Sequence, residues 1–128
     1  MADTSREKRY RDLVAWQSAF KLGLDVYNVT ANWPKHEMFG LTSQIRRAAV
    51  SVSANIAEGY ERRRKTEFAR FLEIARGSLG EVETFLLFAL ELKYVSQAEY
   101  NKLDEQRKLA AKLICGLHNR QKSPANSN

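Results

Sequence analysis

The sequence has little that would interrupt or cross-link a helix. Its 128 residues include two prolines and six glycines, a scarcity that favours long helices over many short strands. A single cysteine, Cys115, excludes an intrachain disulfide and suits a reducing compartment. The longest apolar run, residues 85–90, is too short to span a bilayer, and the N-terminal residues lack the apolar core of a signal peptide. We therefore expect a cytoplasmic protein without membrane contact.

Patterns typical of catalysis and metal binding are also missing. His36 and His118 stand far apart in the sequence, and no H-x-x-x-H, C-x-x-C or E-x-x-H spacing occurs. Cys115 would need a nearby base to act as a nucleophile, and its apolar sequence neighbours indicate a packed core residue instead. We predict a protein that is not an enzyme and that holds no metal or other cofactor.

What the sequence does contain is an ordinary globular composition with a basic surplus. Hydrophobic residues make up 44% and charged residues 28%, which together with the length suits one domain. The formal net charge is +6. Such a surplus attracts polyanions such as nucleic acid, although many small proteins carry as much without binding any.

Four segments show the apolar period of an amphipathic helix. They span about residues 12–31, 38–59, 66–94 and 97–119. The short links between them favour antiparallel neighbours. We predict an all-α, antiparallel up-down-up-down four-helix bundle over residues 12–119, with a flexible basic segment at 1–11 and a disordered tail at 120–128.

Local signals mark the ends of these segments. Asp12 and Thr66 are suited to cap the first and third helices, because their side-chain oxygens accept hydrogen bonds from free N–H groups. Ser96 and Glu99 have the spacing of a capping box before the fourth helix. Gly59 fits a C-terminal stop of the second helix.

The apolar positions assign an inner face to each helix. In the first helix it is expected to consist of Leu13, Trp16, Phe20, Leu24 and Tyr27. In the second it follows Leu41, Ile45, Ala48, Val52 and Asn55. In the third it is an unbroken heptad seam of Phe68, Leu72, Ala75, Leu79, Val82, Leu86 and Ala89. In the fourth it comprises Leu103, Ala110, Leu113, Ile114 and Leu117.

Two helices carry more apolar surface than one bundle core needs. The third has a second stripe, formed by Phe71, Ile74, Ser78, Phe85, Phe88 and Leu92. The second is mostly small or apolar along another line, formed by Arg46, Val50, Ser53 and Ala57. A helix that is apolar on more than one side is usually buried on more than one side. We therefore expect a homo-oligomer, and we interpret Gly77 and Gly80 as positions where a neighbouring helix packs closely.

Asn55 and Glu58 form a structural polar motif in the second helix. Asn55 lies on an apolar seam, where an amide without hydrogen bonds costs about 1–3 kcal/mol. It is expected either to fix register or partner geometry or to be a satisfied core amide. Glu58 is expected to pair with Arg46, Arg47 or Arg62.

The densest run of positive charge, residues 62–65, precedes the third helix. Clustered cations gain from counterion release when they bind phosphates. The candidate nucleic-acid-binding residues are Arg46, Arg47, Arg62, Arg63, Arg64, Lys65 and Arg70. A solvated loop that keeps the protein soluble is supported equally well.

Residues 40–59, GLTSQIRRAAVSVSANIAEG, closely resemble the signature of the 23S rRNA-intervening-sequence proteins, also called the S23 or four-helix-bundle protein family. Residues 11–17 look like the opening of that family, and residues 67–83 look like its third helix. The family often has proline where this chain has Ser53, so the second helix is expected to be straighter here.

The resemblance implies a bundle that forms a ring-like homopentamer. Some members are encoded within intervening sequences of bacterial 23S rRNA genes, which describes a gene location and establishes no activity. The family is also similar to the accessory variability protein of diversity-generating retroelements, a basic pentameric bundle that binds a reverse transcriptase and nucleic acid.

These observations lead to one main hypothesis and two alternatives. The main hypothesis is a non-catalytic homo-oligomer that associates with nucleic acid, RNA or DNA, with RNA favoured, through a basic surface. The first alternative is a protein-interaction adaptor or scaffold, for example for a reverse-transcriptase-like partner. An enzyme of undescribed type, with Asn55, Glu58 and the arginines as its only chemical groups, is the weaker alternative.

Overall fold

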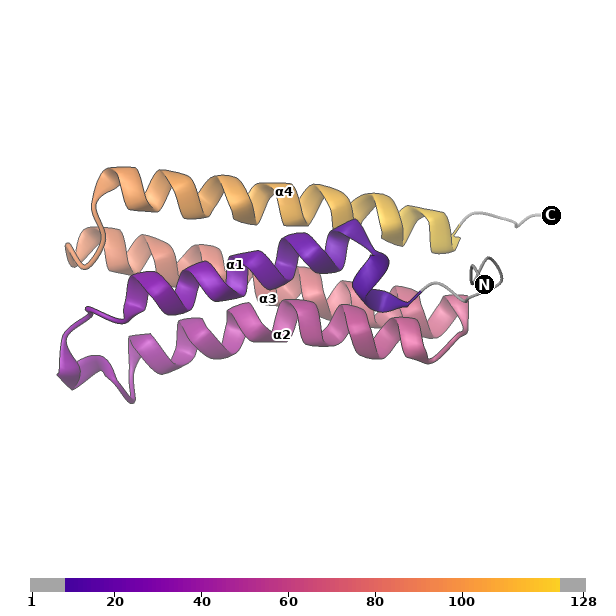
Figure 1. Cartoon of the computed structure of the whole chain (residues 1–128), viewed down its shortest axis with the longest axis horizontal. Coiled ribbons are helices and arrows are strands. Elements are labelled where there is room, and N and C mark those ends of the chain that lie inside the picture. The colour runs from indigo at the N-terminus through magenta and orange to yellow at the C-terminus, as the bar shows by residue number, and fades with distance from the viewer. Residues whose placement is uncertain (1–8, 123–128) are drawn as a thin grey trace, which may run out of the picture.

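Four long helices run side by side along the length of the molecule (Figure 1). The computed structural model describes residues 9–122. Its elements are η1 (Tyr10–Asp12), α1 (Val14–Thr30), η2 (Lys35–Glu37), α2 (Leu41–Glu61), α3 (Lys65–Glu91) and α4 (Gln97–Lys122). Successive long helices are antiparallel, and the described residues form no strand, so the prediction of an all-α four-helix bundle is confirmed.

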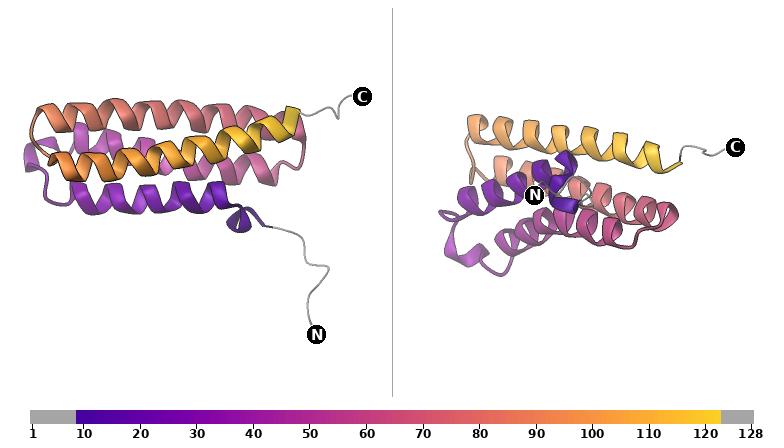
Figure 2. Two further views of the ribbon diagram at one scale, coloured as in Figure 1. Left: turned by 90° about the horizontal axis from the view of Figure 1, so that it is seen from above. Right: turned by 45° about the vertical axis from the view of Figure 1, so that its right-hand side comes forward.

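Each helix packs against two others. α1 contacts α2 and α4, α3 also contacts α2 and α4, and no contacts join α1 to α3 among the described residues. The helices therefore form a four-cornered bundle in which α1 and α3 are diagonally opposed (Figure 2). α3, with 27 residues, is about 40 Å long at 1.5 Å per residue.

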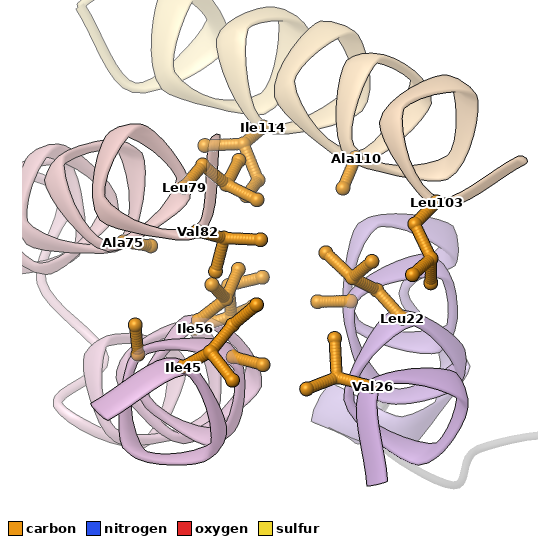
Figure 3. Packing of buried hydrophobic residues seen from close by; sticks show 14 of the residues in the cluster. Leu22, Val26, Ile45, Ile56, Ala75, Leu79, Val82, Leu103, Ala110 and Ile114 are labelled. Atoms are coloured by element: carbon orange, nitrogen blue, oxygen red, sulfur yellow. The ribbon is translucent and has the colours of Figure 1, made fainter. Parts of the chain in front are cut away.

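The core lies on the bundle axis, where side chains from all four helices meet (Figure 3). The heptad seam predicted for α3 is confirmed, since all seven of its residues are buried. α2 contributes Ile45, Ala48, Val52 and Ile56, which are buried to the same degree. In α4 the expected inner residues are buried except Leu113, which is half-buried.

The inner face predicted for α1 is wrong for three of its five residues; the other two, Leu13 and Trp16, are half-buried and pack against the core. Its buried residues are the smaller set Ala15, Ala19, Leu22, Gly23, Val26 and Thr30. Phe20, Leu24 and Tyr27 point away from the core, and their exposed fractions are 45%, 52% and 45%. Small residues let α1 lie close to α2, and the helix keeps its large side chains on its outer side. The apolar residues of this helix therefore form two faces. The face with the larger side chains is exposed, and the other one packs in the core.

The structure corrects three of the four predictions about residues that begin or end a helix. Asp12 belongs to η1, where its carboxylate accepts a hydrogen bond from the Arg9 N–H at 2.9 Å, so it does not cap α1. α3 begins at Lys65, which places Thr66 inside the helix. Gly59 lies within α2, which continues to Glu61.

The capping box before α4 is confirmed. The Glu99 N–H donates to Ser96 Oγ at 3.1 Å, and the Ser96 N–H donates to Glu99 Oε1 at 2.9 Å. Each side chain thus satisfies a backbone group that the helix itself leaves free. This signal is local in sequence, which is why it could be recognised without tertiary information.

The terminal boundaries also differ from the prediction. η1 begins at Tyr10, inside the segment expected to be flexible, and the Tyr10 ring meets Trp16 edge-on at 5.4 Å. α4 continues to Lys122, so residues 120–122 are helical. The remainder of the two predicted terminal segments, 1–8 and 123–128, lies outside the described residues. Within residues 9–122 no helix combines the length and apolar character needed to cross a membrane.

A polar clasp closes the end of the bundle where α1 joins α2. The Tyr94 hydroxyl donates to Glu37 Oε2 at 2.8 Å, and the Leu41 N–H donates to Glu37 Oε1 at 3.0 Å. These hydrogen bonds, that of Leu41 first, lower the pKa of the Glu37 carboxyl, and Glu37 in turn raises the pKa of Tyr94. The buried Trp33 packs beside the Tyr94 ring at 5.6 Å. The clasp therefore ties the α1–α2 link to the α3–α4 turn.

Candidate nucleic-acid interface

The basic run occupies the tight turn between α2 and α3. All four of its side chains, Arg62, Arg63, Arg64 and Lys65, are exposed. Arg63 has a φ of 63°, the left-handed conformation that usually falls to glycine after a helix C-terminus. Arg64 is the N-cap residue of α3 and makes no side-chain cap hydrogen bond. The turn lies at the same end of the bundle as η1 and the last turn of α4 (Figure 1).

Two of the predicted arginines are held by neighbouring carboxylates. Arg62 Nη2 lies 2.8 Å from Glu58 Oε2, and Arg70 Nη2 lies 3.1 Å from Glu67 Oε1. Both guanidinium groups also lie over the Phe71 ring, at 5.1 Å and 4.6 Å from its centroid. Of the three arginines expected as partners of Glu58, the structure places Arg62 beside it. The hydrogen bond from Arg70 lowers the pKa of Glu67, as expected for a carboxylate in a cationic setting.

The other three cations of the basic run, Arg63, Arg64 and Lys65, border a pocket at the end of the bundle. Its volume is about 280 Å³. Its lining comprises Leu13, Tyr60, Arg63, Arg64, Lys65, Phe68, Leu117 and Gln121. Sequence reasoning missed the uncharged members of this set as functional candidates. They come from the start of α1 and from α2, α3 and α4, so only the tertiary fold brings them together.

Arg46 and Arg47 are not part of this cluster. They lie near the start of α2, about 24 Å along the helix from Arg62. Arg46 donates through Nε to Thr30 Oγ1 at 2.8 Å, and its guanidinium lies over the Tyr27 ring at 4.4 Å. It thereby joins α2 to α1, whereas Arg47 is exposed. The seven candidate residues thus form one group of five at the α2–α3 turn and a separate pair.

Asn55 is half-buried and hydrogen-bonded within the protein. Its Nδ2 donates to the Ser51 carbonyl at 2.8 Å and to Ser51 Oγ at 2.9 Å. Ser51 Oγ lies 2.8 Å from Ser78 Oγ, so the polar chain continues from α2 to α3. This geometry orders the contact between two helices.

The match to known proteins agrees with this architecture. The model of the 23S rRNA-intervening sequence protein family matches residues 11–116. The chain belongs to this family. The matched range contains α1, α2 and α3 in full, α4 as far as residue 116, the α2–α3 turn and most of the pocket lining.

One solved structure shows the same fold. It is a protein of unknown function from the S23 ribosomal protein family of Bacteroides thetaiotaomicron VPI-5482. The two chains share 20% sequence identity with a TM-score of 0.76, over 83% of this chain and 96% of the other. No curated protein matches this chain.

The remaining candidate residues are Cys115, His36 and His118. Cys115 is exposed, which corrects the prediction that it packs in the core. His118 is buried with Nε2 3.0 Å from Glu73 Oε2, and His36 is exposed. Among residues 9–122, no three His, Cys, Asp or Glu side chains gather as metal ligands.

The two glycines expected at a close helix contact do not make one within the subunit. A Cβ atom built on Gly77 or Gly80 meets no atom within 4 Å. The close contact in this protein is at Gly59 instead, where a built Cβ would lie 2.6 Å from the Phe71 Cβ. Spacing alone did not distinguish an outward glycine from an inward one.

Proposed function

We propose that this chain is a non-catalytic four-helix-bundle protein that assembles into a ring-like homo-oligomer and binds nucleic acid through the basic α2–α3 turn. RNA is the expected nucleic acid, and five is the subunit number that the family resemblance implies. The observation that carries the proposal is the combination, in one subunit, of uncovered apolar surface and a concentrated cationic turn.

Two apolar stripes support the assembly. The α1 stripe consists of Phe20, Leu24 and Tyr27, and the α3 stripe consists of Ile74, Phe88 and Leu92. Each of these side chains is between 42% and 57% exposed. Contiguous apolar surface of this kind marks a site where a protein partner binds. The two stripes lie on helices that do not contact each other, and they consist of different residues. Two different apolar surfaces on one subunit suit a head-to-tail contact, and such contacts form a ring where the rotation between subunits closes.

The cationic turn supports the nucleic-acid part. The candidate cations of the α2–α3 end number five, all on one turn and the first part of α3. Ring symmetry would repeat this group on every subunit, so that weak phosphate contacts add through multivalency. A cluster of cations attracts an anion through its charge, and anion binding is all that the proposed function requires.

Two measurements on the full chain test this proposal. Light scattering after size exclusion should give a mass several times that of one subunit. Binding to structured RNA over a salt series should weaken steeply as salt rises. A strictly monomeric chain would contradict the assembly, and undetectable binding at low salt would contradict the nucleic-acid role.

A matched pair of variants locates the binding surface. Replacing Arg62, Arg63, Arg64 and Lys65 by alanine should lower RNA affinity by more than tenfold without unfolding the protein, because these side chains are exposed. The control replaces four other exposed cations, Lys35, Lys102, Lys108 and Lys112, by alanine. Equal losses in the two variants would show that net charge, and not the turn, drives binding.

The same apolar stripes favour one second candidate, an adaptor or scaffold for another protein, such as a reverse-transcriptase-like partner. In that case the stripes would be covered by the partner and the chain would be monomeric by itself. A pulldown that survives nuclease treatment and is abolished by Phe20→Glu or Phe88→Glu would favour this candidate. A stable homo-oligomer that buries both stripes would argue against it.

A further inference from the structure

The pocket beside the α2–α3 turn has an apolar floor and a cationic rim. Leu13, Phe68 and Leu117 supply apolar surface, and the Tyr60 ring meets the Phe68 ring edge-on at 5.6 Å. Residues 63–65 supply three positive charges at the rim. None of the described residues that line it is acidic. Its chemistry therefore suits a ligand with one flat apolar part and one anionic part.

The other pockets of the bundle lack this combination. The one between α1 and α4 at the opposite end includes the carboxylates of Asp25 and Glu99. A shallow hollow near the start of α2 contains two cations, Arg46 and Arg47, which is one fewer than at the α2–α3 end. Only at the α2–α3 end do aromatic floor, acid-free lining and three rim cations coincide among the described residues.

The volume and the charge of the pocket further limit the kind of ligand that it can hold. A volume of about 280 Å³ is just below the usual range for ligand pockets, about 300–1,000 Å³, so the pocket has room for one base with its phosphate and cannot enclose a duplex. The pocket includes Arg64 and Lys65, where α3 begins without a side-chain cap, so free backbone N–H groups add to the positive potential. Gln121 contributes an amide group to the lining, the kind that reads base edges.

We propose that this pocket holds one unstacked nucleotide of a single strand in each subunit, with its base against Tyr60 and Phe68 and its phosphate among Arg63, Arg64 and Lys65. The inference rests on the proposed nucleic-acid role and makes it more specific. It adds that the protein selects unpaired nucleotides, because a paired base would first have to leave its stack.

Mononucleotide titrations separate the base from the phosphate. AMP and ribose 5-phosphate are added in turn to the ¹⁵N-labelled full chain, and backbone amide shifts are followed. AMP should shift the amides of Tyr60, Phe68 and Gln121 and bind at least about fivefold more tightly than ribose 5-phosphate, because of base–aromatic stacking. Equal affinities, or AMP-induced shifts centred on Arg47 at the other end of α2, would overturn the proposal.

Arg63 offers a variant that removes a rim cation without loss of fold. Arg63→Gly relieves a left-handed residue, so stability should be kept or increased. Its matched control is Lys93→Gly, since Lys93 is also an exposed cation with a φ of 65° and lies at the other end of the bundle. Arg63→Gly should weaken binding of single-stranded oligoadenylate about fivefold and lower the salt slope by about 0.7 per subunit, whereas Lys93→Gly should leave both unchanged.

Tyr60→Leu tests the floor of the pocket while keeping an apolar side chain there. It should weaken oligoadenylate about fivefold and leave an abasic strand of the same length unaffected. Thermal unfolding of each variant establishes that the comparison is made on folded protein.

The outcomes distinguish this inference from the proposed function. If the protein binds single strand and duplex equally, and Arg63→Gly and Tyr60→Leu keep full affinity, the proposed role of the pocket is overturned. The basic turn then remains a general nucleic-acid surface. Displacement of AMP by oligoglutamate at comparable affinity would also overturn the proposed role of the pocket, since an acidic peptide would then be the occupant. Absence of binding to any nucleic acid would overturn both.

Discussion

At the scale of single residues, adding a methyl group to a glycine is expected to have opposite effects on stability in α2 and in α3. Gly59 is buried where α2 meets α3, and a Cβ there would lie 2.6 Å from the Phe71 Cβ and 3.0 Å from Phe68 Cδ1. The Phe71 Cβ is fixed to its backbone, so a methyl group could be accommodated only by moving the helices apart. Gly77 faces open space in the middle of α3.

We predict that Gly59→Ala destabilises the protein by about 1–3 kcal/mol, because the added methyl overpacks the contact. Gly77→Ala, the matched control, should stabilise an isolated subunit by up to about 1 kcal/mol through helix propensity. Urea denaturation of the two variants checks both signs. A Gly59→Ala protein as stable as the parent would show that the α2–α3 contact is looser than described.

At the scale of elements, prediction from sequence succeeded where one signal dominated. The α3 seam is a strong heptad pattern, and Ser96 with Glu99 acts over one helical turn, so both could be recognised. In α1 two faces compete, and the larger side chains of Phe20 and Tyr27 drew the assignment to the outer one. The pocket at the α2–α3 turn could not be predicted, because its floor is assembled from side chains of four helices.

The polar clasp gives the α2 N-terminus a pH-dependent support. The Glu37 pKa is lower in the folded protein than in the unfolded chain, so its contribution to stability is full above the usual glutamate value, about 4.3, and is lost as the pH falls through the folded value. We predict that Glu37→Gln lowers stability at pH 7 and that the difference from the parent shrinks below about pH 4.

Urea midpoints of parent and variant across this range provide the measurement. Glu105→Gln, which changes an exposed carboxyl on α4, is the control and should give a small difference in stability from the parent. A Glu37→Gln difference that stayed constant from pH 7 to pH 3 would show that ionisation of Glu37 makes no contribution to stability.

At the scale of the whole molecule, the position of the apolar stripes determines what kind of oligomer can form. A two-fold dimer pairs one patch with its own copy, whereas the α1 stripe and the α3 stripe lie on diagonally opposed helices and differ in residues. If the α1 stripe of one subunit packs on the α3 stripe of the next, every subunit uses both stripes once, and the contacts form a ring when the rotation between subunits closes.

Two complementary variants distinguish this arrangement from a two-fold dimer. Phe20→Glu with Leu24→Glu disables the α1 stripe, and Phe88→Glu with Leu92→Glu disables the α3 stripe; all four side chains are exposed, so each subunit should still fold. We predict that each variant alone is monomeric, because a charge buried in an apolar contact without a partner is strongly unfavourable. An equimolar mixture should contain one intact contact per pair and stop at a heterodimer, measured by light scattering or native mass spectrometry. Two-fold pairing would behave differently, since the variant that retained its self-complementary stripe would still dimerise alone and the mixture would form no new species.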